Sequence, residues 1–443
     1  MLSRRGSLAL LTTALGPFVA LLIIIAFFAI ADWASGGDTF LTVQNLRTVS
    51  RQMCVVAVAA LGMTVVVISG GIDLSVGSAI ALAATVLAWG IHNDAALLVT
   101  TGSSFRSASI RLADAQARAQ TAHSDDQPHW QAETAHWRDV LRGIVERKLA
   151  TAEAAAEAES ESASDASGQR RRQADVRRLQ EKLIQLANTE ADIEIDNQWF
   201  LGVHNHRATA PLALLLCMAT GVAAGLINGA LISTLRVVPF IVTLGTMTVF
   251  LGLGKLIPEV PIRPEIAEIP GWVGRLTWPQ PEPAWMLVAS GVWVALVLSA
   301  TLALMLRFTV LGRHIFAIGS NEAAARLCGI NVRRVKLTVY ALAGLFTGIA
   351  GIYNFSELSQ GDPTSGTGFE LRVIAAVVIG GASLSGGRGS VLGALTGAAL
   401  MATITSGCTQ LGLPNPIQDV IVGLIIVAAV TVDQLRQRRL RTA

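Results

Sequence analysis

Long apolar runs alternate with short polar or glycine-rich stretches along most of the chain. A transmembrane helix needs roughly 20 consecutive, mostly apolar residues, and several of the runs reach that length. These runs and the shorter apolar stretches between them predict membrane helices over residues 8–30, 55–69, 79–90, 211–235, 240–256, 285–306, 337–355, 369–379, 390–409 and 420–432. The pattern therefore predicts an all-α, polytopic membrane protein of about ten transmembrane helices.

A polar segment interrupts this pattern and divides the chain into three parts, residues 1–91, 92–207 and 208–443. Within the segment, apolar side chains recur at helical spacing on two faces, separated by a low-complexity stretch at 159–169. The first face holds Trp130, Trp137, Leu141 and Ile144, and the second, heptad-like face holds Val176, Leu179, Leu183, Leu186 and Ile193. We expect two helices that fold back on each other as an antiparallel, coiled-coil hairpin.

The orientation of the chain follows from the loop at 307–336. Its basic side chains are Arg307, Arg313, His314, Arg326, Arg333, Arg334 and Lys336, against the single acid Glu322. Short loops rich in Lys and Arg stay on the cytoplasmic side of the membrane. Alternation of the spans then places both chain termini in the cytoplasm and the 92–207 insert on the outer side.

The same loop has the features of a short surface helix. Asn321 is a residue type that caps helix N-termini, and Glu322 precedes Arg326 by four residues, the favourable order for a helical ion pair. A basic topological anchor without any further role explains the composition equally well.

Composition and motifs exclude several classes of protein. The 443 residues are 52% apolar and only 15% charged, and the net charge of +3 gives no reason to expect nucleic-acid binding. The four cysteines, Cys54, Cys217, Cys328 and Cys408, have neither disulfide nor metal-site spacing, and buried packing is expected for them. The pair His204 and His206 lacks further ligands, so no metal site is expected. No catalytic motif is present, and the energy for transport must come from an ion gradient or a separate subunit.

Two glycine-rich breaks interrupt the apolar runs. The first break contains Gly70, Gly71, Asp73, Ser75, Gly77 and Ser78, and the second contains Gly380, Gly381, Gly386, Gly387 and Gly389. Paired glycines allow a helix to break, and Asp73 or Ser75 can cap the helix that follows. An acid at a membrane segment is also a functional candidate, so a cap and a solute contact are both open for Asp73.

Four stretches together resemble the permease subunits of ribose/xylose/arabinose-type ABC sugar importers. They are GGIDLSVGS (70–78), GSNEAAARLCGINV (319–332), GDPTSGTGFEL (361–371), which we expect to be an outer loop, and IGGASLSGGRGSVLGA (379–394). The resemblance covers residues 8–91 and 208–435 and leaves the insert without a counterpart.

This resemblance implies a channel in the bacterial inner membrane formed by two permease copies, identical or paralogous. A cytoplasmic ABC ATPase subunit would bind ATP and drive it, and a periplasmic binding protein would deliver the sugar. The chain itself would then carry no cofactor and no catalytic residue. The 319–332 block would form the coupling helix that docks into the ATPase, with Gly319, Asn321, Glu322, Arg326, Gly329 and Asn331 as its site residues.

Polar residues within the predicted spans are candidates for the solute path. They are Thr64, Asn228, Thr243, Asn354 and Ser356, and hydrogen bonding between helices is the alternative role for each. An ion-coupled secondary transporter of a small polar solute is the rival interpretation, and it requires ionisable residues near the middle of the membrane. Asp73, Glu370, Arg372 and Asp419 all fall near predicted span ends, which argues against that interpretation.

Overall fold

The computed structural model describes residues 4–93, 105–121, 126–160, 166–187, 206–257, 261–264, 269–278 and 286–441. The chain forms two compact units, a membrane unit (residues 1–88, 214–263 and 271–443) and an insert unit (89–213 and 264–270). In the described residues the regular structure is helical, apart from one isolated bridge between Ile262 and Gly361. The predicted all-α class is confirmed.

Each predicted membrane run forms a helix. These helices are α1 (Arg4–Ala34), α2 (Val43–Ile68), α3 (Val76–His92), α9 (His206–Leu235), α10 (Pro239–Leu256), α12 (Ser290–Phe308), α15 (Val332–Leu358), α16 (Phe369–Ile379), α17 (Val391–Gln410) and α18 (Asn415–Arg441). In the described part of the chain, 7 helices are long and apolar enough to cross a membrane, while α3 and the first part of α18 are shorter apolar helices. The protein is therefore a polytopic membrane protein, as predicted.

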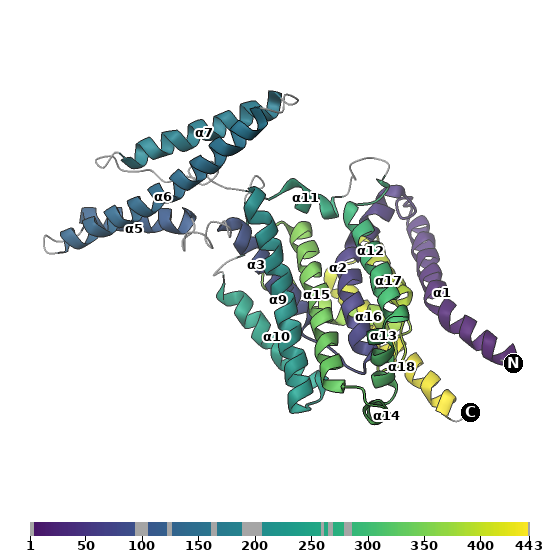
Figure 1. Cartoon of the computed structure of the whole chain (residues 1–443). Coiled ribbons are helices and arrows are strands. Elements are labelled where there is room, and N and C mark those ends of the chain that lie inside the picture. The colour runs from purple at the N-terminus through teal and green to yellow at the C-terminus, as the bar shows by residue number, and fades with distance from the viewer. Residues whose placement is uncertain are drawn as a thin grey trace. The chain divides into compact units, whose positions relative to one another are not determined.

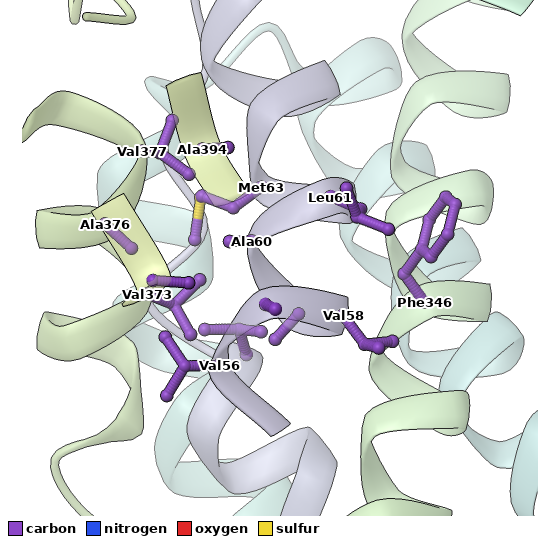
Figure 2. Close-up of a cluster of buried hydrophobic side chains, with 14 of the residues drawn as sticks. Val56, Val58, Ala60, Leu61, Met63, Phe346, Val373, Ala376, Val377 and Ala394 are labelled. Atoms are coloured by element: carbon purple, nitrogen blue, oxygen red, sulfur yellow. The ribbon is translucent and has the colours of Figure 1, made fainter. Parts of the chain in front are cut away.

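Helix α2 forms the centre of the membrane unit. From Cys54 to Ile68 it is apolar on almost every side, and all of these residues are buried. Figure 1 shows α2, α12, α15 and α17 side by side, and Figure 2 shows Met63 directed towards Val377 and Leu61 towards Phe346. A helix that is hydrophobic all round lies inside a bundle, so the other spans are arranged around α2.

Glycines set the distance between α9 and α15. A Cβ atom at Gly221 would overlap the carbonyl oxygen of Gly344, and one at Gly225 would overlap the carbonyl oxygen of Tyr340. The spacing of these glycines in the sequence predicts such close packing in lipid, and the structure confirms it.

A valine at Gly225 should therefore destabilise the membrane unit. The added side chain would force α9 away from α15, and overpacking of this kind typically costs about 1–3 kcal/mol. Gly245→Val on α10 is a matched control, since nothing lies within 4 Å of a Cβ at that position. We expect a lower thermal midpoint in detergent for Gly225→Val only, and equal midpoints for the two variants would contradict this account.

The insert unit consists of three described helices instead of the predicted two. They are α5 (Phe105–Thr121), α6 (Gln127–Ser160) and α7 (Ala166–Ala187). Residues Leu141 and Ile144 of α6 pack with Leu179 and Leu186 of α7 as predicted, but α5 adds Ala108 and Leu112 to the same apolar cluster. The prediction missed α5 because its buried face is made largely of alanine, which gives a weak hydrophobic pattern.

The predicted tryptophans of α6 lie against α5. The guanidinium of Arg111 lies 4.8 Å from the ring centre of Trp137, and that of Arg118 lies 4.8 Å from Trp130. Such cation–π contacts favour the association of two helices. Ile193 lies outside the described residues, and a knobs-into-holes coiled coil remains a prediction.

Three of the four cysteines are buried free thiols, as expected. Cys54, Cys217 and Cys408 are buried in the membrane unit, but Cys328 is exposed, which corrects the prediction for that residue. Cys328 is the C-cap of the short helix α14 (Glu322–Leu327), where the chain turns at the surface. In the described residues no group of three His, Cys, Asp or Glu side chains could hold a metal ion, and His204 lies outside those residues.

Candidate coupling and gating site

The basic loop folds as two short helices before α15. Helix α13 (Val310–Ser320) is followed by α14, and Asn321 caps α14 by accepting a hydrogen bond from the backbone nitrogen of Ala324 at 3.0 Å. Asn331 caps α15 in the same way, through the nitrogen of Arg334 at 3.1 Å. The two asparagines therefore define where the short helix begins and where the next membrane helix begins.

Glu322 fixes α14 to α15. Its carboxylate accepts hydrogen bonds from Arg326 at 3.0 Å, the predicted helical pair, and from Lys336 at 2.7 Å. The hydrogen bond from Lys336 is the main cause that lowers the pKa of Glu322, and the charges of Lys336 and Arg326 act in the same direction. Lys336 was not predicted as a partner, because a contact between residues 14 positions apart leaves no periodic signal in the sequence.

An apolar side chain is left uncovered on α14. Leu327 is 90% exposed, and with Glu322, Ala323 and Arg326 it lines a depression in the surface. Together with the charged side chains of Glu322 and Arg326, this leucine gives α14 a small exposed surface that is both apolar and charged.

The two glycine-rich breaks meet at the end of α13, next to Gly319. The backbone nitrogen of Gly387 donates a hydrogen bond of 2.8 Å to the carbonyl oxygen of Ile68 at the end of α2. A Cβ atom at Gly319 would overlap that same oxygen, and one at Gly386 would lie 3.0 Å from the Cα of Gly70. We call this meeting point of α2, α13 and the 380–389 turn the glycine junction.

The chain after the glycine junction forms the break between α2 and α3. Gly70 has a φ of +83°, in the left-handed region that favours glycine. One carboxylate oxygen of Asp73 accepts hydrogen bonds from the backbone nitrogen of Ser75 at 2.9 Å and from its hydroxyl at 2.6 Å. Ser75 is the residue whose carbonyl begins α3, by accepting from the nitrogen of Ala79 at 2.8 Å. Asp73 thus orders the turn before α3 through Ser75.

Two other helices hold this break. The amide nitrogen of Asn228 on α9 donates to the hydroxyl of Ser75 at 2.8 Å, and its amide oxygen accepts from Thr246 of α10 at 2.7 Å. The hydroxyl of Thr243 donates to the carbonyl oxygen of Ile72 at 3.2 Å. All of these polar groups except Ile72 are buried, so the break is fixed by a buried hydrogen-bond chain from Asp73 to Thr246.

Tyr340 of α15 faces the break from the other side. Its side chain is 1% exposed, and its hydroxyl has no hydrogen-bond partner among the described residues. A Cβ atom at Gly71 would lie 2.6 Å from that hydroxyl. Tyr340 was not predicted as part of this site, and its one signal in the sequence is a tyrosine inside a mostly apolar run.

The 361–371 stretch lies deeper than the predicted outer loop. A Cβ atom at Gly361 would press on Thr85 and Ala88 near the end of α3, whereas one at Gly366 would overlap the carbonyl oxygen of Gly77 in its first turn. The stretch therefore runs along α3 towards the break. Gly366 and Gly77 both lack side chains, and this allows the close approach that a loop of larger residues could not make.

The candidate solute-path residues are not gathered at one place. Asn228 and Thr243 hold the break, whereas Asn354 donates to Ser365 at 2.9 Å and Ser356 donates to the carbonyl oxygen of Val273 at 2.8 Å. The hydroxyl of Thr64 donates to its own helix, at Ala60. These bonds support the helix-to-helix alternative, and a contact with solute remains a prediction for all five.

Comparison with known proteins identifies the family that this chain resembles. Residues 186–430 match the family described as branched-chain amino acid transport system / permease component. The ribose import permease protein of Escherichia coli is 38% identical over 236 residues, which cover 52% of this chain and 70% of that protein. No solved structure matches the chain.

Two further relatives carry names with other solutes. The L-arabinose ABC transporter permease protein of Azospirillum brasilense is 36% identical over 241 residues, covering 53% of this chain and 68% of that protein. The autoinducer 2 import system permease protein of Photorhabdus luminescens is 33% identical over 223 residues, covering 50% and 65% of the two chains.

Proposed function

This chain belongs to the family of branched-chain amino acid transport system permease components, and from that premise we propose that it translocates a monosaccharide across the bacterial inner membrane. A periplasmic binding protein delivers the sugar, and a cytoplasmic ABC ATPase subunit drives the transport. Relatives named for ribose and L-arabinose support a monosaccharide, and the relative named for autoinducer 2 supports another small polar solute as the alternative.

Membership in the family settles two points about the chemistry. The chain is the non-catalytic permease of an ABC importer, which binds no cofactor itself, and ATP hydrolysis belongs to a separate subunit. The ion-coupled secondary transporter is therefore the weaker interpretation, since an ABC permease does not derive its energy from an ion gradient.

The observation that carries the proposal is the exposed surface of α14, which follows directly after α13 and its contact with the glycine junction. Leu327 offers an apolar anchor, Glu322 fixes α14 to α15, and Gly319 joins α13 to the end of α2. A force applied to α14 by an ATPase would reach the break at 69–75 through these contacts. In Figure 1 both ends of the chain and α14 lie towards the same end of the membrane unit, which agrees with the proposed cytoplasmic side.

We assign a role or a location to each of the three predicted parts of the chain. Residues 1–91 and 208–443 together form the permease, and residues 307–336 are its coupling loop. Residues 92–207 extend into the periplasm. The insert then lies on the side where the binding protein docks, and its three helices form a separate compact unit.

Co-purification from native membranes tests the docking surface. We expect an ABC ATPase subunit to stay bound to the wild type in mild detergent and to be lost from Leu327→Glu, because the charge removes the apolar anchor. Leu358→Glu is the control. Leu358 is also exposed, but it is the last residue of α15, whereas α14 precedes the first residue of α15. If mass spectrometry finds no ATPase with the folded wild type, the proposed function is wrong.

A further inference from the structure

An ion pair joins α16 and α18 on the surface of the membrane unit. The guanidinium of Arg372 lies 3.6 Å from the carboxylate of Asp419, and these side chains are 37% and 71% exposed. Both residues were predicted near span ends, but the structure places Arg372 deeper.

The packing of α16 on α17 gives the depth of the pair. Gly380 lies against Gly393, and Ala376 lies against Gly397, so the two helices run antiparallel in a fixed register. One further turn places Arg372 level with Met401, which is midway along the 20 residues of α17. Since α17 is about as long as the hydrocarbon core is thick, the Arg372 side of the pair lies well inside the membrane.

Contact with lipid is unfavourable for this charged surface. Charged side chains within a membrane almost always face protein or a water-filled cavity, because lipid chains cannot solvate them. The exposed side of α12 provides a contrast, since no charged residue occurs between Trp293 and Leu306. The α12 surface suits lipid, and the α16–α18 surface does not.

The surroundings of the pair suit a protein partner. The exposed apolar side chains Leu371, Val420, Leu424 and Val427 lie on the same two helices, and a Cβ at Gly423 would meet nothing within 4 Å. The face thus combines one positive charge, one negative charge and an apolar rim. Such a patch is complementary to itself when a second copy is related to the first by a two-fold axis.

We propose that the α16–α18 face is where a second copy of this chain docks, with the Arg372–Asp419 pairs of the two copies enclosed between them. The inference rests on the proposed function and deepens it, since the family resemblance implies a channel formed by two permease copies. It adds which face of this chain closes that channel and which charged groups lie along it.

Disulfide cross-linking of the full chain in native membranes tests the proposal. Val420→Cys lies on the proposed face and Val297→Cys on α12, and the two valines are similarly exposed at 60% and 65%. Both are made with Cys328→Ser, which removes the exposed native thiol and leaves the buried ones in place. We expect an oxidant to convert most of the Val420→Cys protein to a covalent dimer and to leave Val297→Cys monomeric.

A charge exchange adds a second readout on the same background. Arg372→Glu should strongly reduce the dimer formed through Val420→Cys, and Arg372→Asp combined with Asp419→Arg should restore it. No dimer through Val420→Cys, or as much dimer through Val297→Cys, overturns the proposal. An ATPase that still co-purifies in that case leaves the proposed function standing, whereas a dimer without any ATPase would contradict the function and not the interface.

Discussion

Replacing Gly319 by valine should abolish solute uptake while the membrane helices stay folded and assembled. A Cβ at this position overlaps the carbonyl oxygen of Ile68, and that oxygen also accepts the hydrogen bond from Gly387. The valine must push the end of α2 away from α13 and the 380–389 turn. A strain of about 1–3 kcal/mol that destabilises one conformation of the transport cycle reduces uptake by about 5- to 150-fold.

The measurement is uptake of radiolabelled ribose and L-arabinose, normalised to the amount of protein in the membrane. Gly252→Val on α10 is the control, because nothing lies within 4 Å of a Cβ there. Co-purification of the ATPase should persist in Gly319→Val, since Leu327 and Glu322 are unchanged. Uptake equal to that of the control would show that the glycine junction does not transmit the motion.

The membrane helices were predictable because burial in lipid or in a helix bundle leaves a continuous apolar signal. The sequence of α2 from Cys54 to Ile68 is apolar on almost every side, and this is visible without any knowledge of its neighbours. The cap at Asn321 was equally accessible, since a cap is a contact over three residues. Local interactions of this kind leave local patterns.

The glycine junction was not predictable as a unit, although each of its glycines was singled out. Gly70, Gly319 and Gly387 lie in three distant parts of the chain, and only the folded backbone brings them together. The depth of Arg372 was missed for a related reason. The apolar run that contains it is short, and its true level depends on how α16 packs on α17.

Asn228→Leu should cause the second large effect, a loss of both stability and uptake. Leucine can neither donate to Ser75 nor accept from Thr246, so both hydrogen bonds between helices are lost. Ser75 keeps its bond to Asp73 and Thr246 its bond to Thr243 within α10, so the cost is that of two lost hydrogen bonds, about 0.5–1.5 kcal/mol each. The break at 69–75 would then be held to α9 by packing alone, and its position would no longer be fixed relative to α10.

A double-mutant comparison separates the hydrogen-bond chain from general damage to α9. Thr220→Val on the same helix is the control, since the hydroxyl of Thr220 bonds within α9, to Leu216. Thr246→Val added to Asn228→Leu should cost less than the sum of the two single changes, because the pair is coupled.

The thermal midpoint in detergent and uptake per folded protein are measured for each variant. A lowered midpoint with unchanged uptake per folded protein would make the hydrogen-bond chain purely structural. Additive effects of the two changes would mean that Asn228 does not act through Thr246, and the break would then have to be positioned by Thr243 and the glycine junction.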